Sequence, residues 1–196
     1  MELILSLLLK FWQFTVLGIL IIVGFIINLF DKKIDKRVNF KYEEYPHMRP
    51  LRIPTKGKGF WSAIFLWLLT VRQWEIVKDF HYEINGTHYV IPAGFQFDGA
   101  SIPKFLASFL SPVGVLLIGG LVHDYAYKYS ALKPSNDKDP ILLLDQKKAD
   151  EIFRDINIEI NGFYFLNYLA YYALRLGGFV AWNGHRKVGA TIKGEK

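Results

Sequence analysis

The chain of 196 residues contains no cysteine. The absence of cysteine excludes disulfide bonds, thiolate nucleophiles and zinc sites with cysteine ligands. A protein without cysteine folds in either redox environment, so the sequence leaves the cellular compartment open. The fold must be held together by packing and hydrogen bonds alone, and the length suits one folded core with an appendage.

Charge is absent from residues 11–30, FWQFTVLGILIIVGFIINLF. A helix of this length rises far enough to cross a hydrocarbon core of roughly 30 Å. The run is too long for a signal peptide and no small-residue cleavage site follows it, so it predicts an uncleaved transmembrane helix within a membrane anchor over 1–31. Because more basic residues follow the run than precede it, the charge rule predicts a single-pass protein with a cytoplasmic C-terminal domain.

Hydrophobic residues make up 52% of the chain and aromatic residues 16%, and the formal net charge is +6. Basic residues gather after the apolar run and in the tail over 183–196. This arrangement suits anionic lipid headgroups, so a lipid bilayer is the predicted partner and nucleic acid is disfavoured.

The segment 32–59 is basic and contains several prolines and glycines, which predicts an irregular linker. The next segment, FWSAIFLWLLTV over 60–71, is apolar but too short to span a bilayer. It predicts an interfacial helix with its tryptophans at headgroup level, and a buried core helix is an equal alternative.

Residues 72–182 predict a folded domain. Apolar residues alternate through WEIVKDFHYEI, and Asn85-Gly86 then favours the positive φ angles of a tight turn, so a β-hairpin is expected. Helical periodicity follows over 104–110, 114–130, 145–160 and 163–181, with a loop over 131–144. The predicted fold class is α+β and mainly α, with an N-terminal transmembrane helix, a β-hairpin and a core of antiparallel helices.

In LVHDYAYKYS, His123 and Asp124 stand side by side after ten mostly apolar residues. His123 and Tyr127 are four residues apart and share one helix face, whereas Asp124 points to the side of the histidine. This arrangement suits a general base with a cation-holding carboxylate beside it. The alternative is a core histidine with satisfied hydrogen bonds and a surface aspartate.

Two further aspartates extend this pattern. Asp98 lies in the glycine-containing turn FDGASIP, where oxygen atoms can converge on a hard cation such as Ca²⁺, or where the carboxylate can cap the next helix. Asp150 lies at the edge of the apolar stripe of the helix over 145–160. We expect it within hydrogen-bonding reach of His123, where it would fix the imidazole tautomer.

The motifs IPAGFQFDGASIP, HDYAY, KKADEIF and YYALRLGGFVAW resemble an uncharacterised family carried by phages and prophages, a domain of unknown function. The order D-G-x-S-x-P, H-D-x-x-Y and D-x-x-F also resembles, more distantly, the catalytic core of phospholipase A2 in its bacterial and fungal branch. That resemblance implies that His123 is the base, that Asp150 orients it and that Tyr127 supports Asp150. It also implies Asp98 and Asp124 as Ca²⁺ ligands and hydrolysis of the sn-2 ester of glycerophospholipids.

The chain departs from the phospholipases in two respects. It lacks their disulfides, and it lacks the cysteine-flanked, glycine-rich calcium loop of the animal enzymes. The rival hypothesis is a non-enzymatic, membrane-bound structural or accessory protein of a phage virion or prophage, with lysis or exclusion roles included. Its partners would then be other virion proteins. An HD phosphohydrolase is disfavoured because the remaining histidines fall in the linker, the hairpin and the tail.

Overall fold

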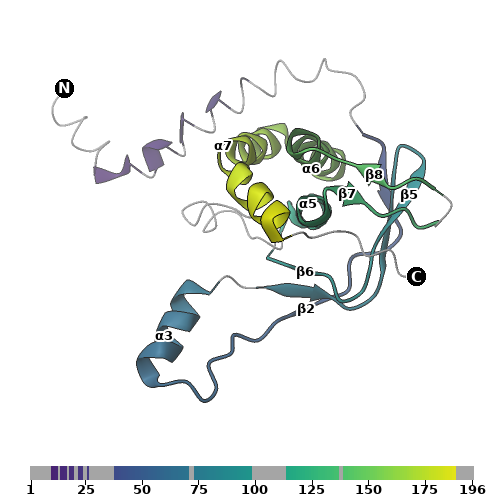
Figure 1. The fold of residues 1–196 in the computed structure, drawn as a ribbon. Helices are drawn as coiled ribbons and strands as arrows, with labels where there is room; N and C mark the ends of the chain where they lie inside the picture. Colours follow the sequence, from purple (N-terminus) through teal and green to yellow (C-terminus); the bar gives the residue numbers. More distant parts are fainter. Residues whose placement is uncertain are drawn as a thin grey trace, which may run out of the picture.

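The computed structural model describes residues 38–70, 73–98, 114–136 and 139–188, together with residues 10–12, 14–16, 18–19, 22–23 and 26. Two groups of elements make up this part of the chain (Figure 1). Short antiparallel strands dominate the first half, and three helices dominate the second. The predicted helix over 104–110 lies outside the described residues.

The strands form three small antiparallel sheets. The first sheet has the order β1-β4-β5, from Phe40–Tyr42, Phe80–Ile84 and Thr87–Ile91. The second has the order β2-β3-β6, from Met48–Pro50, Trp74–Ile76 and Gln96–Phe97, and the third pairs β7 (Ala131–Leu132) with β8 (Leu142–Leu143).

The predicted β-hairpin is confirmed. Strands β4 and β5 pair antiparallel, and the turn between them places Asn85 at φ 51° and Gly86 at φ 86°. Residues alternate between buried and less buried along β4, so its apolar face is Phe80, Tyr82 and Ile84. The alternating segment is nevertheless two strands in two different sheets, because β3 ends at Ile76.

Three long helices follow: α5 (Leu117–Tyr129), α6 (Gln146–Asn161) and α7 (Tyr164–Val188). Asp145 caps the start of α6 by accepting a hydrogen bond from the Lys148 N–H at 2.7 Å. The same helix ends where Gly162 adopts a left-handed conformation with φ 62°. Local capping thus fixes both ends of the helix that carries Asp150.

The directions of these helices follow from their contacts. Along α5 and α6, Gly119 faces Asn157 whereas His123 meets Asp150, so the two helices are antiparallel. Along α6 and α7, Asn161 bonds Asn167 whereas Asp150 bonds Arg175, so this pair is antiparallel as well. The predicted arrangement of antiparallel helices is therefore present within the domain.

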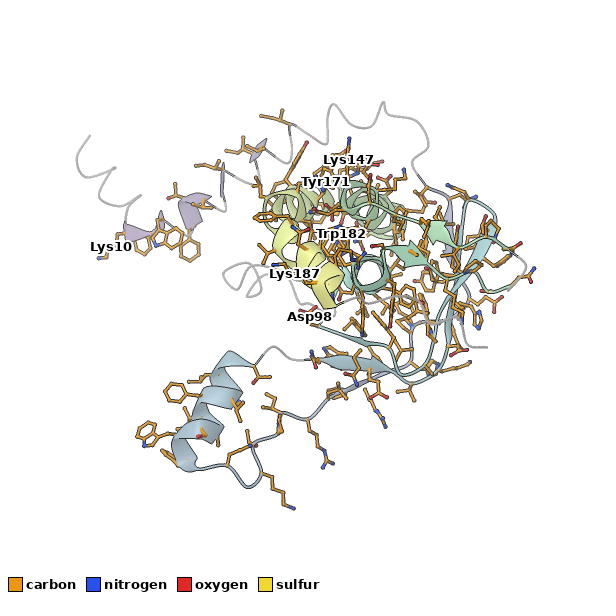
Figure 2. The ribbon with its side chains drawn as sticks, viewed as in Figure 1. Lys10, Asp98, Lys147, Tyr171, Trp182 and Lys187 are labelled. Atoms are coloured by element: carbon orange, nitrogen blue, oxygen red, sulfur yellow. The ribbon has the colours of Figure 1, made fainter. Side chains whose placement is uncertain are left out.

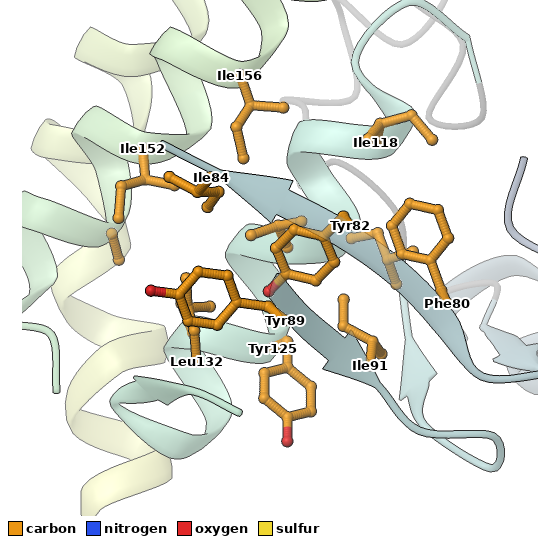
Figure 3. Close-up of a cluster of buried hydrophobic side chains, with 14 of the residues drawn as sticks. Phe80, Tyr82, Ile84, Tyr89, Ile91, Ile118, Tyr125, Leu132, Ile152 and Ile156 are labelled. Atoms are coloured by element: carbon orange, nitrogen blue, oxygen red, sulfur yellow. The ribbon is translucent and has the colours of Figure 1, made fainter. Parts of the chain in front are cut away.

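The main core lies where β4 and β5 pack against α5 and α6. Figure 3 shows the aromatic rings of Tyr82 and Tyr89 above Tyr125, with Ile152 and Ile156 of α6 closing one side. The predicted apolar stripe of α6 is buried here, with Ile156 fully inaccessible to solvent. This core holds α5 and α6 in the register that brings His123 to Asp150.

The prediction of a mainly α fold with an N-terminal transmembrane helix is wrong. The supposed linker over 32–59 contributes both β1 and β2, but strands of three residues are too short to produce a visible alternation. Within the part of the chain that the structure describes, no helix is both long and apolar enough to cross a bilayer. The predicted span covers residues 11–30. Many of these residues lie outside the described ones. The prediction of a single-pass membrane protein is therefore not supported.

Candidate functional site

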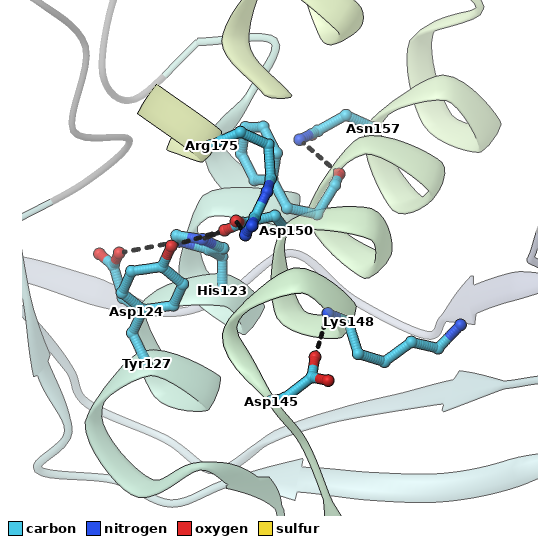
Figure 4. Close-up of polar contacts among 9 residues, drawn as sticks. His123, Asp124, Tyr127, Asp145, Lys148, Asp150, Asn157 and Arg175 are labelled. Carbon is cyan, nitrogen blue, oxygen red and sulfur yellow. Dashed lines mark hydrogen bonds and ion pairs between the residues drawn. The ribbon is translucent and has the colours of Figure 1, made fainter. Parts of the chain in front are cut away.

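The polar centre of the molecule is the carboxylate of Asp150, which is completely buried. One oxygen, Oδ1, accepts hydrogen bonds from His123 Nε2 at 2.9 Å and from the Tyr127 hydroxyl at 2.6 Å. The other oxygen, Oδ2, accepts a hydrogen bond from Arg175 Nη1 at 2.7 Å. Figure 4 shows these donors converging on Asp150 from α5 and α7. The predicted contact between His123 and Asp150 is confirmed.

The partners of Asp150 determine its charge. Burial acts to raise the pKa of Asp150, but the hydrogen bonds from His123, Tyr127 and Arg175 outweigh burial and lower that pKa below its usual value. Asp150 is therefore an ionised acceptor at neutral pH. An ionised acceptor at Nε2 keeps the proton on that nitrogen, so the lone pair of neutral His123 is at Nδ1.

The other ring nitrogen of His123, Nδ1, faces Asp124. His123 Nδ1 lies 3.7 Å from Asp124 Oδ1, and the histidine is only 5% exposed. Burial acts to lower the pKa of His123, but the hydrogen bonds and charges of Asp124 and Asp150 outweigh it and raise the pKa above its ordinary value. A raised pKa strengthens the imidazole as a proton acceptor.

Asp98 and Asp124 form the second part of the site. Burial raises the pKa of Asp124 to about 7, and the charge of Asp98 and a hydrogen bond that the protonated Asp124 carboxyl donates to Asp98 act in the same direction. The structure thus brings together the two aspartates that the sequence assigned to a cation. Asp124 Oδ2 is buried and makes no hydrogen bond to any described residue.

These two carboxylates fit part of a calcium site. Calcium takes six to eight oxygen ligands, so two aspartates supply only some of them. Across the ranges that the structure describes, no three acidic, histidine or cysteine side chains form a metal-binding group. The buried Asp124 Oδ2 is the atom that such an ion would satisfy. The segment after Asp98, where further ligands were predicted, lies outside the described residues.

The C-terminal end of α7 adds positive charge beside the carboxylates. Burial lowers the pKa of His185, and the charges of Arg186 and Lys128 lower it further, while Asp98 opposes them. Asp98 is drawn near the last turns of α7 in Figure 2. Arg186 donates to the carbonyls of Tyr127 and Lys128 at 2.6 and 2.8 Å, which ties this end of α7 to the end of α5.

Sequence reasoning missed two residues of the site, Arg175 and Gly178. Arg175 is the only charged residue between positions 163 and 182, and a lone charge in an apolar helix signals a buried partner. Gly178 lies against Tyr127, and a Cβ atom added there would collide with the Tyr127 hydroxyl. Its neighbour Gly177 has open space at the same point.

This difference gives a prediction with a built-in control. Gly178→Ala should lower the free energy of unfolding by about 1–3 kcal/mol, because the new methyl group pushes Tyr127 away from Asp150. Gly177→Ala should raise it by about 0.5–1 kcal/mol, because alanine favours a helix over glycine. Urea unfolding of the two variants measures the difference, and its sign should be opposite for the two neighbours.

Tyr127→Phe tests the cause of the Gly178 effect. The phenylalanine lacks the hydroxyl that the new Cβ would meet, so Gly178→Ala should cost less in the Tyr127→Phe background than in the wild type. Equal costs in both backgrounds would show that the damage arises elsewhere in α7.

Among known proteins, the chain matches one family model. No curated protein and no solved structure matches the chain. The family described as a protein of unknown function (DUF1353) matches residues 74–174, a range that starts at β3 and includes His123, Asp124, Tyr127 and Asp150. This match confirms the predicted membership of an uncharacterised domain family, while the phage origin stays a prediction. The chain belongs to the DUF1353 family of proteins of unknown function.

Proposed function

We propose that the chain is a hydrolase that cleaves the sn-2 ester of glycerophospholipids by general-base catalysis. The observation that carries the proposal is the buried pair of His123 and Asp150, in which Nε2 bonds Asp150 and Nδ1 is the nitrogen that can accept a proton. The same order and roles of residues occur in phospholipase A2, which the motifs resemble.

The reaction begins with a water molecule between His123 and the ester. Nδ1 of His123 takes a proton from the water while the oxygen attacks the ester carbonyl carbon. The tetrahedral intermediate collapses, and the bond between the carbonyl carbon and the glycerol oxygen breaks. His123 then returns its proton to the leaving oxygen, which yields a fatty acid and a lysophospholipid.

Asp150 and its partners hold the base through this cycle. The imidazolium that forms when His123 takes the proton is stabilised by the Asp150 carboxylate at 2.9 Å. Tyr127 and Arg175 keep that carboxylate oriented and ionised. Asp150 is therefore a positioning residue, since it acts on the substrate only through His123.

Asp98 and Asp124 are the residues that would hold calcium in this proposal. When bound, the ion would polarise the ester carbonyl and neutralise the phosphate group. The two carboxylates suit a hard cation, because one is buried with an oxygen that bonds no described residue. The charges of Lys128 and Arg186 act on His185, as does the charge of Asp98. Positive charge beside the two carboxylates favours an anionic substrate.

The test is fatty-acid release from mixed phospholipid vesicles. With purified full chain, release should come from the sn-2 position and should require calcium, so that a chelator stops it. Asp124→Asn should abolish both the release and the calcium binding seen by calorimetry, because the neutral amide cannot replace a carboxylate ligand. Asp145→Asn, at the cap of α6, is the matched control and should keep both.

Two results would contradict this function. Release that continues unchanged with the chelator would remove calcium from the mechanism. Equal rates of fatty-acid release by wild type and Asp124→Asn would show that a contaminant causes the activity.

A further inference from the structure

The helix α3 (Phe60–Leu69) exposes large apolar side chains to solvent. Its sequence, FWSAIFLWLL, has no charged residue. Figure 1 shows this helix standing apart from the three helices of the domain, at the end of an extended arm. Between 56% and 71% of each of the following side chains is accessible: Phe60, Trp61, Phe65, Trp67 and Leu68. These residues are called the α3 apolar face. The predicted alternative of a buried core helix is wrong.

The α3 apolar face is too large for an ordinary surface. Aromatic side chains bury roughly 150–250 Å² each when they pack, and soluble monomers rarely leave several of them together in water. At 100° per residue, the face covers about 160° of the helix circumference. That stripe is wider than the narrow seam that a partner helix covers in a coiled coil. The face therefore fits an extended apolar medium better than a single helix.

The charge around α3 identifies the medium. Between Leu51 and Gln73 the chain has four basic residues and no acidic residue. Arg52, Lys56 and Lys58, in the arm that leads to the helix, are exposed. Positive charge beside an apolar face complements an anionic lipid surface, whereas two copies of the same basic arm would repel each other.

We propose that α3 inserts its apolar face into the headgroup region of an anionic lipid bilayer. Ten residues of helix rise only about 15 Å, half of a hydrocarbon core, so α3 lies in the interface and does not cross. Tryptophan side chains favour this depth, because the ring is apolar and its N–H reaches water. The lysines of the arm then face the lipid phosphates. The proposal stands on α3 alone and does not depend on the proposed hydrolysis.

The absence of cysteine makes the test direct, because a single cysteine can be introduced without removing a native one. Trp67→Cys carries an environment-sensitive fluorophore in the α3 apolar face. Val77→Cys, which is 52% exposed and lies outside α3, carries the same fluorophore as the control. Both sites are exposed, so labelling leaves the core of the domain unchanged.

The labelled full chains are mixed with vesicles of phosphatidylcholine, with or without phosphatidylglycerol. The emission of the label at position 67 should shift to the blue with phosphatidylglycerol present, and lipids brominated in the acyl chain should quench it. The label at position 77 should change little. Lys56→Gln and Lys58→Gln should each weaken binding to the anionic vesicles roughly 5-fold, and binding to phosphatidylcholine less.

The fluorescence measurements also distinguish the other ways in which the α3 apolar face could be covered. Blue-shifted emission without vesicles that grows with protein concentration would show that a second copy covers the face. Blue-shifted emission without vesicles at every concentration would show that another segment of the same chain covers it. An unshifted label with all vesicles, or equal shifts at positions 67 and 77, would also overturn the proposal.

Discussion

His123→Asn should reduce the rate of fatty-acid release by about 10²–10⁴-fold, the usual contribution of a general base. Asparagine is an uncharged polar side chain whose amide lies at the level of Nδ1, so the hydrogen bond from Nε2 to Asp150 is also lost. It has no basic nitrogen that can take a proton from water. The loss should therefore appear in the rate at saturating lipid, while the apparent affinity for vesicles stays unchanged.

The control for this variant is a histidine away from the site. His88 lies on β5, where its side chain is 71% exposed and its Nε2 lies 4.0 Å from Glu83 Oε2. His88→Asn should keep the wild-type rate and the wild-type stability. A wild type as inert as His123→Asn across phospholipid classes would instead favour the accessory role, in which the fold persists without turnover.

The β-hairpin and the three helices of the domain were predictable because their signals are local. Asn85-Gly86 specifies a tight turn, and the apolar stripe of α6 repeats at helical spacing. The strands β1 and β2 were not predictable, because each has three residues and pairs with a strand distant in the sequence. Register of this kind depends on tertiary contacts, which a window of sequence does not contain.

The contacts of the site were likewise predictable where their signals are local, and not where they depend on tertiary packing. His123 and Tyr127 share a face of one helix, so their contact with the same carboxylate follows from spacing. Arg175 reaches Asp150 only because α7 packs antiparallel to α6, and Gly178 matters only because Tyr127 lies against it. The transmembrane prediction depended on hydropathy over 11–30 alone, and many of those residues lie outside the described ones.

The largest expected effect on stability belongs to Asp150→Ala, which should lower the free energy of unfolding by about 3–5 kcal/mol. The substitution removes the acceptor of three donors at once and leaves the Tyr127 hydroxyl and the Arg175 guanidinium without their carboxylate. Glu151→Ala, the next residue on α6, removes ion pairs with the exposed Lys147 and Lys148. It should change stability by about 1 kcal/mol or less.

The pH dependence of unfolding separates the charge of Asp150 from its packing. The pKa of Asp150 is lowered in the folded state, so its contribution is present above the unfolded value of about 3.9 and is lost as pH falls through the folded pKa. The pKa of His123 is raised, so its contribution is full below about 6.5 and is lost as pH rises through the folded pKa. The stability gap between wild type and Asp150→Asn should therefore be widest between these two limits.

Asp124→Asn provides the comparison of opposite sign. Burial raises the pKa of Asp124 to about 7, so ionisation of this carboxylate costs stability as pH rises from about 4 to 7. In the absence of calcium, Asp124→Asn should therefore unfold at a higher temperature than wild type at pH 8 and at a similar one at pH 4. Asp150→Asn should unfold at a lower temperature than wild type at pH 6. Thermal unfolding followed by circular dichroism at these three pH values measures both. If both substitutions changed the unfolding temperature in the same direction, the assignment would be wrong. That assignment is that ionisation of Asp150 stabilises the fold and ionisation of Asp124 destabilises it.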